Sequence, residues 1–118
     1  RHRPASPVRI STPSKYAPGW PDGAYFEGVD INDPLVTPGP HRSVLARFPP
    51  TLLVSGTRDI ALSNAVVSHA ALLEAGVDAR LFVQEGLGHG HFYAFPGTPE
   101  SSTAYDVIWN FFDAQLAR

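Results

Sequence analysis

The sequence predicts an α/β fold in which parallel strands are flanked by helices. Two short apolar runs, residues 51–55 and 79–84, have the length and composition of strands. Each is followed by a segment with helical spacing, and the joining loops are short. Because parallel neighbours need a crossover between them, this alternation indicates a βαβα unit of an α/β sandwich.

The first strand is an apolar run ended by Gly56, which is typical of a strand covered on both faces. The helix after it, over residues 62–75, is expected to take Ser63 or Asn64 as its N-cap and to stop at Gly76. Its predicted buried face follows three-and-four spacing and consists of Leu62, Val66, His69, Ala70 and Leu73. On that face His69 is interpreted as a core histidine with its hydrogen bonding satisfied.

The second strand, residues 79–84, is followed by a glycine-rich loop and then by the last helix. That helix opens with Thr98 as N-cap, Pro99 at the first helical position and Glu100 near the positive end of the dipole. Its apolar stripe consists of Tyr105, Ile108, Trp109, Phe112 and Leu116.

The N-terminal part of the chain has a different composition. The first fifteen residues carry Arg1, Arg3, Arg9 and Lys15 without one acid, and ten of the twelve prolines lie within residues 1–50. We expect residues 1–24 to be an extended or disordered arm and residues 25–118 to form the α/β domain. The alternative is an arm that docks on an acidic surface.

Composition narrows the classes of function. A formal net charge of -2 argues against nucleic acid as a partner, and no apolar run is long enough to span a bilayer. The sequence has no Cys, which leaves the redox compartment open. It also has no Met, so we expect a processed or excised piece rather than a whole translation product.

Two polar side chains follow the two predicted strands. Asp59 comes after the first strand and His89 lies in the loop after the second. Ligand sites in parallel sheets form outside the carboxyl ends of the strands, so we expect the two side chains to lie close together. An Asp that orients a His is the acid and base part of a nucleophilic triad. The alternatives are a turn or capping role for Asp59 and a solvated loop position for His89.

Glycines and a second histidine surround His89. Gly86, Gly88 and Gly90 keep the backbone free of Cβ atoms, as a tight loop that presents one side chain requires. His91 is the alternative base, because it lies in the same loop. A His-Gly-His sequence with one Asp nearby is a weak metal site, so no metal is predicted.

Several stretches of residues 25–116 resemble the C-terminal part of the hormone-sensitive-lipase-like α/β-hydrolase carboxylesterases. They are Tyr25-Phe-Glu-Gly-Val-Asp-Ile-Asn-Asp-Pro-Leu-Val-Thr-Pro38, Phe48-Pro-Pro-Thr-Leu-Leu-Val-Ser-Gly-Thr-Arg-Asp59, Ala75-Gly-Val-Asp78 and Glu85-Gly-Leu-Gly-His89. The resemblance implies that Asp59 is the triad acid and His89 the triad base. It also implies short-chain acyl esters as substrates, no cofactor and a cytoplasmic location.

The nucleophile of such a triad is missing from this sequence. No Gly-x-Ser-x-Gly occurs in residues 1–118, and hydrolases of this fold place that Ser before the Asp and the His. By the resemblance, the nucleophile elbow, the His-Gly-Gly oxyanion segment and the cap would all precede residue 1. We therefore expect the C-terminal fragment of an α/β-hydrolase fold that is inactive alone.

Two interpretations of function remain. The chain is either the acid and base portion of a carboxylesterase or a non-catalytic, self-associating α/β module derived from one. Both predict a soluble, cofactor-free protein. We also expect a homodimer or larger assembly, because a truncated sheet exposes an open edge and apolar area on Leu52, Val54, Leu81 and Val83. The resemblance places the contact at residues 79–84 and 98–117.

Overall fold

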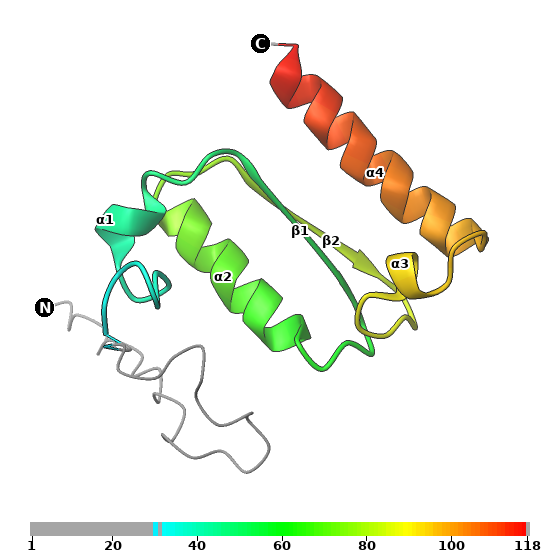
Figure 1. The fold of residues 1–118 in the computed structure, drawn as a ribbon, viewed down its shortest axis with the longest axis horizontal. Helices are drawn as coiled ribbons and strands as arrows, with labels where there is room; N and C mark the ends of the chain where they lie inside the picture. The colour runs from blue at the N-terminus through cyan, green and yellow to red at the C-terminus, as the bar shows by residue number, and fades with distance from the viewer. Residues whose placement is uncertain (1–29, 31, 118) are drawn as a thin grey trace, which may run out of the picture. The chain divides into compact units, whose positions relative to one another are not determined.

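The computed structural model describes residue 30 and residues 32–117. The arm predicted for residues 1–24 and the start of the domain predicted for residues 25–118 lie outside the described residues, so these boundaries stay predictions. The elements, in chain order, are α1 (Arg42–Leu45), β1 (Thr51–Gly56), α2 (Leu62–Glu74), β2 (Ala79–Gln84), α3 (His91–Ala94) and α4 (Pro99–Leu116) (Figure 1).

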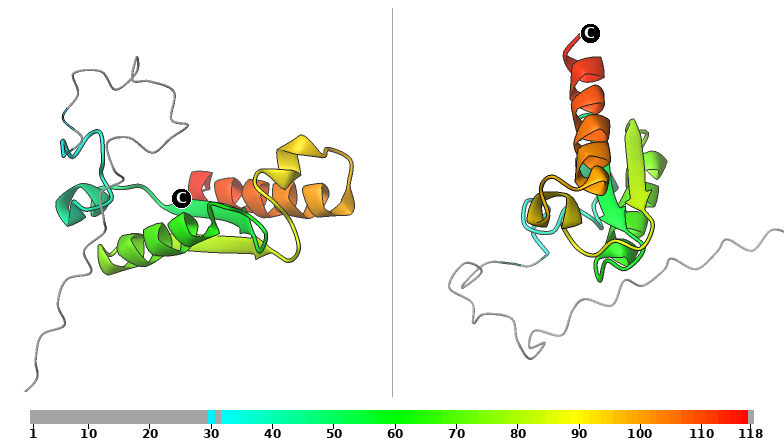
Figure 2. Two further views of the ribbon diagram at one scale, coloured as in Figure 1. Left: turned by 90° about the horizontal axis from the view of Figure 1, so that it is seen from below. Right: turned by 90° about the vertical axis from the view of Figure 1, so that its right-hand side faces the viewer.

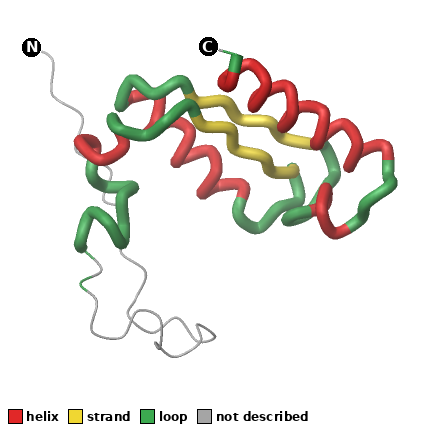
Figure 3. The backbone as a smooth tube through the Cα atoms, turned by 45° about the horizontal axis from the view of Figure 1, so that its top comes forward, coloured by secondary structure: helices red, strands yellow, loops and turns green. Residues whose placement is uncertain are grey.

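The two strands form a parallel sheet, as the sequence predicts. Their register runs from Thr51 opposite Ala79 to Gly56 opposite Gln84, so both strands end at the same level. Helix α2 contacts both strands, and α4 contacts α3 and β1. Figures 2 and 3 show α2 on one side of the sheet and α4 on the other. The predicted α/β class, with parallel strands and flanking helices, is confirmed.

The core lies between the sheet and α2. Its buried residues are Leu45, Leu72, Val77 and Ala79. The partly buried side chains of Leu53, Ala71 and Ala75 pack against them. The two faces of β1 are not both covered: Leu52 and Val54 are only half-buried, as are Leu81 and Val83 of β2. The expectation of a strand covered on both faces is therefore wrong for the described chain, while the expected apolar exposure of the sheet is present.

The start of α2 differs from the prediction. Ala61 is the N-cap, without a side-chain capping bond, and the helix begins at Leu62. Ser63 and Asn64 lie inside the first turn, so they cannot cap it. The predicted end is confirmed, because Gly76 follows the helix with φ +84°.

The buried face of α2 also differs from the predicted one. Leu62, Ala65, His69 and Leu72 turn inward, while Val66 and Leu73 are about half exposed, at 48% and 51%. Both sets follow helical spacing, so the pattern could not select between them. His69 is confirmed as a satisfied histidine: its Nε2 lies 3.1 Å from the Ala79 carbonyl oxygen and joins α2 to β2.

Helix α4 begins as predicted but presents a different face to the molecule. Thr98 Oγ1 accepts a hydrogen bond from the Ser101 N–H, and Pro99 occupies the first turn. The buried residues are Ser101, Ala104 and Phe111. Three members of the predicted apolar stripe are exposed instead, namely Trp109 (59%), Phe112 (49%) and Leu116 (81%).

The short helices α1 and α3 were not predicted, because four residues are too few for a helical period to show in the sequence. Within the part of the chain that the structure describes, no helix combines the length and apolarity that crossing a bilayer requires.

Candidate active site

The candidate site lies where the two parallel strands end. Asp59 follows β1 by three residues, and its Oδ1 accepts a hydrogen bond from the Ala61 N–H at 2.7 Å. This bond closes an Asx-type turn at the entry of α2. Asp59 therefore has the turn role that was the alternative interpretation. The turn bond orients the carboxylate and leaves it able to accept further hydrogen bonds.

The same Oδ1 lies 2.9 Å from Nδ1 of His89. The predicted contact between the two side chains is thus present in the structure. Because a carboxylate only accepts hydrogen bonds, the imidazole Nδ1–H is the donor. The Asp59 side chain is 5% exposed and that of His89 is 62% exposed. The pair therefore combines a buried carboxylate with an imidazole ring that is largely exposed to solvent.

A third partner of Asp59 was missed by the sequence analysis. Ser55 Oγ donates a 2.8 Å hydrogen bond to Oδ2, the carboxylate oxygen that does not meet His89. The sequence analysis assigned no role to Ser55, which lies in no Gly-x-Ser-x-Gly elbow. The signal that would have found it is its position four residues before an Asp, at the end of a strand.

Backbone contacts join the loop that carries Asp59 to the loop that carries His89. The Arg58 N–H donates to the Leu87 carbonyl oxygen at 3.0 Å, and the Gly86 N–H donates to Thr57 Oγ1 at 2.7 Å. Gly56 lies so close to Leu87 that a Cβ at that position would collide with the Leu87 carbonyl. The distance between acid and base is therefore fixed by the loops as well as by the strands.

The hydrogen bonds around Asp59 lower the pKa of its carboxyl below the ordinary value. The Ala61 backbone N–H is the largest cause, and the bonds from Ser55 and His89 act in the same direction, while burial opposes them. The Asp59 carboxyl is therefore ionised at neutral pH, and its negative charge faces the His89 ring.

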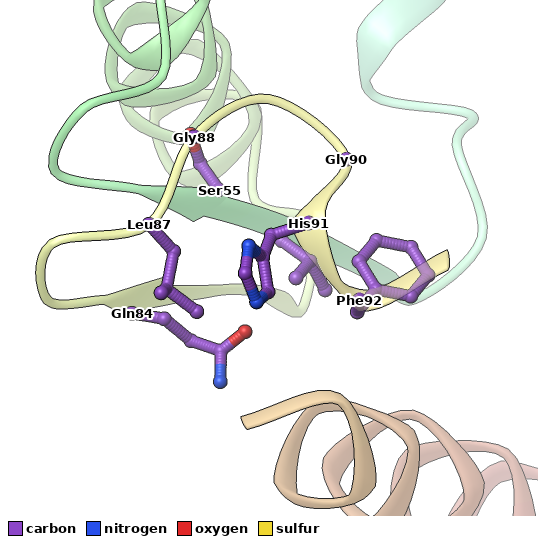
Figure 4. A pocket seen from close by; sticks show the side chains of 8 residues that line it. Ser55, Gln84, Leu87, Gly88, Gly90, His91 and Phe92 are labelled. Carbon is purple, nitrogen blue, oxygen red and sulfur yellow. The ribbon is translucent and has the colours of Figure 1, made fainter. Parts of the chain in front are cut away.

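His91 occupies a different position from His89. It begins α3, and its ring lies 4.8 Å from that of Phe95. Figure 4 shows it among Gln84, Leu87 and Phe92, which help to line a small pocket. Among the described residues, the imidazole that meets Asp59 is that of His89. No three His, Cys, Asp or Glu side chains converge within residues 32–117 in a way that would hold a metal ion.

The predicted role of the glycines is confirmed at two positions of the His89 loop. Gly86 and Gly90 have positive φ, at +75° and +62°, a conformation that residues with a Cβ rarely adopt. Gly88 has no positive φ and has open space beside it.

The arrangement can hold one tautomer of an imidazole and stabilise its protonated form. With Nδ1 bound to Asp59, Nε2 of His89 is the nitrogen left to take a proton from a nucleophile. A buried carboxylate, an exposed imidazole and a strand-end location are the features that the acid and base of a nucleophilic triad require.

Comparisons with known proteins agree with this class. Residues 7–93 match the family model described as "alpha/beta hydrolase fold", and this range includes Asp59 and His89. The chain therefore belongs to the α/β hydrolase fold family, which supports the resemblance to the hormone-sensitive-lipase-like members.

A solved structure is also similar to this chain. It is titled "Crystal structure of an esterase E25", is 42% identical and has a TM-score of 0.64. The match covers 74% of this chain and 26% of that chain, so the present chain spans about a quarter of the esterase. No curated protein sequence matches the chain.

Proposed function

We propose that this chain supplies the acid and the base of a Ser-His-Asp triad in a carboxylic ester hydrolase. The observation that carries the proposal is the 2.9 Å contact between Asp59 Oδ1 and His89 Nδ1. Asp59 orients the imidazole, and His89 takes the proton from a serine through Nε2. The order of Asp before His along the chain is that of α/β-hydrolases.

Two further observations support an ester substrate and an external nucleophile. The similar structure is called an esterase in its title, and the present sequence contains no Gly-x-Ser-x-Gly. The proposed substrates are short-chain acyl esters, and the proposed location is the cytoplasm. The isolated chain of 118 residues is proposed to be inactive, because its sequence contains neither the Gly-x-Ser-x-Gly elbow nor the His-Gly-Gly segment that would supply a nucleophile and oxyanion donors.

The test is a chimera with the similar esterase. Residues 32–117 replace the corresponding C-terminal segment of that enzyme, and turnover of a short p-nitrophenyl ester is measured. An active chimera is expected to lose about 10⁴-fold in kcat on Asp59→Asn, because the imidazole is then held in the wrong tautomer. His89→Ala should remove turnover to a similar extent.

His91→Ala is the matched control, since it removes an imidazole two residues away that does not meet Asp59. It should leave kcat within a few-fold of the parent chimera. An enzyme that survives His89→Ala but not His91→Ala would assign the base to His91. The isolated chain should show no ester turnover above a buffer control. Turnover that a serine-directed organophosphate abolishes would contradict the proposal that the nucleophile lies elsewhere.

The aromatic side chains of α4, of which Trp109 and Phe112 are exposed, favour a second candidate function, that of a self-associating α/β module. Tyr105, Trp109 and Phe112 form a continuous set of ring contacts, with centroids 6.4 Å apart in both pairs. The chimera distinguishes the two candidate functions, because only a hydrolase portion requires Asp59 and His89 for activity.

A further inference from the structure

The Asp59 carboxylate is held at both oxygens. Oδ1 accepts from the Ala61 N–H and from His89, and Oδ2 accepts from Ser55 Oγ. Its side chain is only 5% exposed, so solvent cannot easily replace any of these donors. A buried carboxylate that loses a donor must find another or change its orientation.

Ser55 provides the donor that does not depend on either loop. It lies in β1, where it pairs with Val83 in the parallel register, and it is 8% exposed. The two other donors belong to the turn before α2 and to the glycine loop. A side chain mounted on a strand holds its partner more firmly than one mounted on a loop.

The geometry points to Ser55 as a positioning residue of the triad, whose hydroxyl fixes the plane of the Asp59 carboxylate so that Oδ1 faces His89. This inference rests on the proposed function, because it assigns to Ser55 a role in aligning the acid with the base. The role assigned to Ser55 is one of positioning, because Ser55 is 8% exposed and its hydroxyl donates to Oδ2.

Loss of the hydrogen bond at Oδ2 would displace Oδ1, because the carboxylate can rotate as one planar group. The Ser55 and Ala61 donors bind opposite oxygens, so together they prevent rotation about the bond that joins the carboxylate to Cβ. Without the Ser55 hydroxyl, Oδ2 is buried without a partner, and the carboxylate gains by turning towards a remaining donor or towards water. Either movement displaces Oδ1 from His89.

The test follows the His89 imidazole by nitrogen NMR in the full chain at a pH where the ring is neutral. In the parent, the Nδ1–H tautomer should predominate. The Asp59→Asn variant gives the reference spectrum of a His89 ring without a carboxylate partner. Ser55→Ala should shift the tautomer population most of the way towards that spectrum. Ser55→Cys, which nearly keeps the volume but donates weakly, should shift it in the same direction, and Ser55→Thr, which keeps the hydroxyl, should restore the parent spectrum.

Ser101→Ala is the matched control. Ser101 is 2% exposed and donates to the Phe92 carbonyl oxygen, so its loss removes a buried serine hydrogen bond away from Asp59. It should leave the His89 tautomer unchanged. In the chimera, Ser55→Ala should lower kcat by up to about 10²-fold while KM stays constant, as expected when an aligned group is displaced.

The outcomes distinguish loss of the positioning role of Ser55 from loss of the Asp59–His89 pair. If Asp59→Asn changes the His89 spectrum and neither Ser55→Ala nor Ser55→Cys does, the positioning role is overturned while the acid and base pair stands. If Asp59→Asn itself leaves the spectrum unchanged, the pair is not formed and the proposed function fails. If Ser55→Ala does not fold, the decision rests on Ser55→Cys.

Discussion

Asp59 performs two structural tasks with one carboxylate. Its Oδ1 closes the turn at the entry of α2 through the Ala61 N–H and also meets Nδ1 of His89. The sequence analysis treated a turn role and a triad role as competing explanations. The structure shows that they are compatible, because the turn fixes the oxygen that the imidazole needs.

The lowered pKa of Asp59 predicts how stability depends on pH. Because the folded-state pKa lies below the ordinary value of 3.8, the carboxylate contributes stability above about that pH. This contribution is lost as the pH falls through the folded-state pKa. We expect Asp59→Asn to make the acid limb of the unfolding free energy shallower than in the parent.

The measurement is urea unfolding at a series of pH values between neutrality and the acid transition. Asp106→Asn, on the exposed side of α4, controls for the loss of one negative charge. A parent and an Asp59→Asn variant with parallel curves over the whole range would contradict the assigned stabilisation of the carboxylate.

The site residues differ in how far the sequence could predict them. Asp59 and His89 were predictable, because each is a polar residue that follows an apolar strand in a parallel unit. The Ser55 hydroxyl was missed, because its position four residues before an Asp at the end of a strand is a weak signal until its rotamer and neighbours are known. The contacts of Thr57 and Arg58 with the His89 loop likewise depend on loop geometry that no periodicity encodes.

At the scale of the elements, Gly56 brings the end of β1 against Leu87. A Cβ there would meet the Leu87 carbonyl group, which belongs to the backbone and cannot rotate away. We expect Gly56→Ala to lower the free energy of unfolding by about 1–3 kcal/mol, the usual cost of overpacking. It should also lengthen the contact between Asp59 and His89.

Gly88→Ala is the control within the same pair of loops, because a Cβ there meets nothing within 4 Å. Chemical denaturation of both variants, with the His89 imidazole spectrum as a second readout, checks the prediction. Equal stability of the two variants would show that the approach of Gly56 to Leu87 does not constrain the loops.

The helices show where periodicity stops being informative. The positions of α2 and α4 and the end signals Gly76, Thr98 and Pro99 were predictable from local rules. Their buried faces were not, because α2 and α4 each carry apolar residues on more than one face. Selecting between such faces requires knowledge of what packs against them, and a sequence of one chain does not contain it.

At the scale of the whole molecule, the described chain leaves a large apolar surface uncovered. On α4, Trp109, Phe112 and Leu116 form one exposed stripe, and both strands have half-buried apolar side chains. Such surfaces favour association with another chain. We propose that the isolated chain forms a homodimer or a larger assembly through this stripe and the edge of β2.

Charged substitutions in the stripe test the proposal. Light scattering at micromolar concentration should report more than one 12.8 kDa chain per particle for the parent. The double substitution Trp109→Glu and Phe112→Glu should shift the particle to one chain, because burying the new charges opposes association. Asn110→Glu, an exposed position between them, should leave the assembly intact.

A parent that is a monodisperse monomer with cooperative unfolding would contradict the association. It would show that one βαβα unit, with its small core, buries enough surface to fold alone.

The bonds from Arg58 to Leu87 and from Gly86 to Thr57 also determine how the site is lost. They tie the two loops to each other at the level where the strand ladder ends. The amide protons of Arg58 and Gly86 should therefore exchange with solvent at the rate of the β1 amides, as one cooperative unit, rather than at the faster rate of fraying loops. Misalignment of the acid and base would then require opening of the sheet itself.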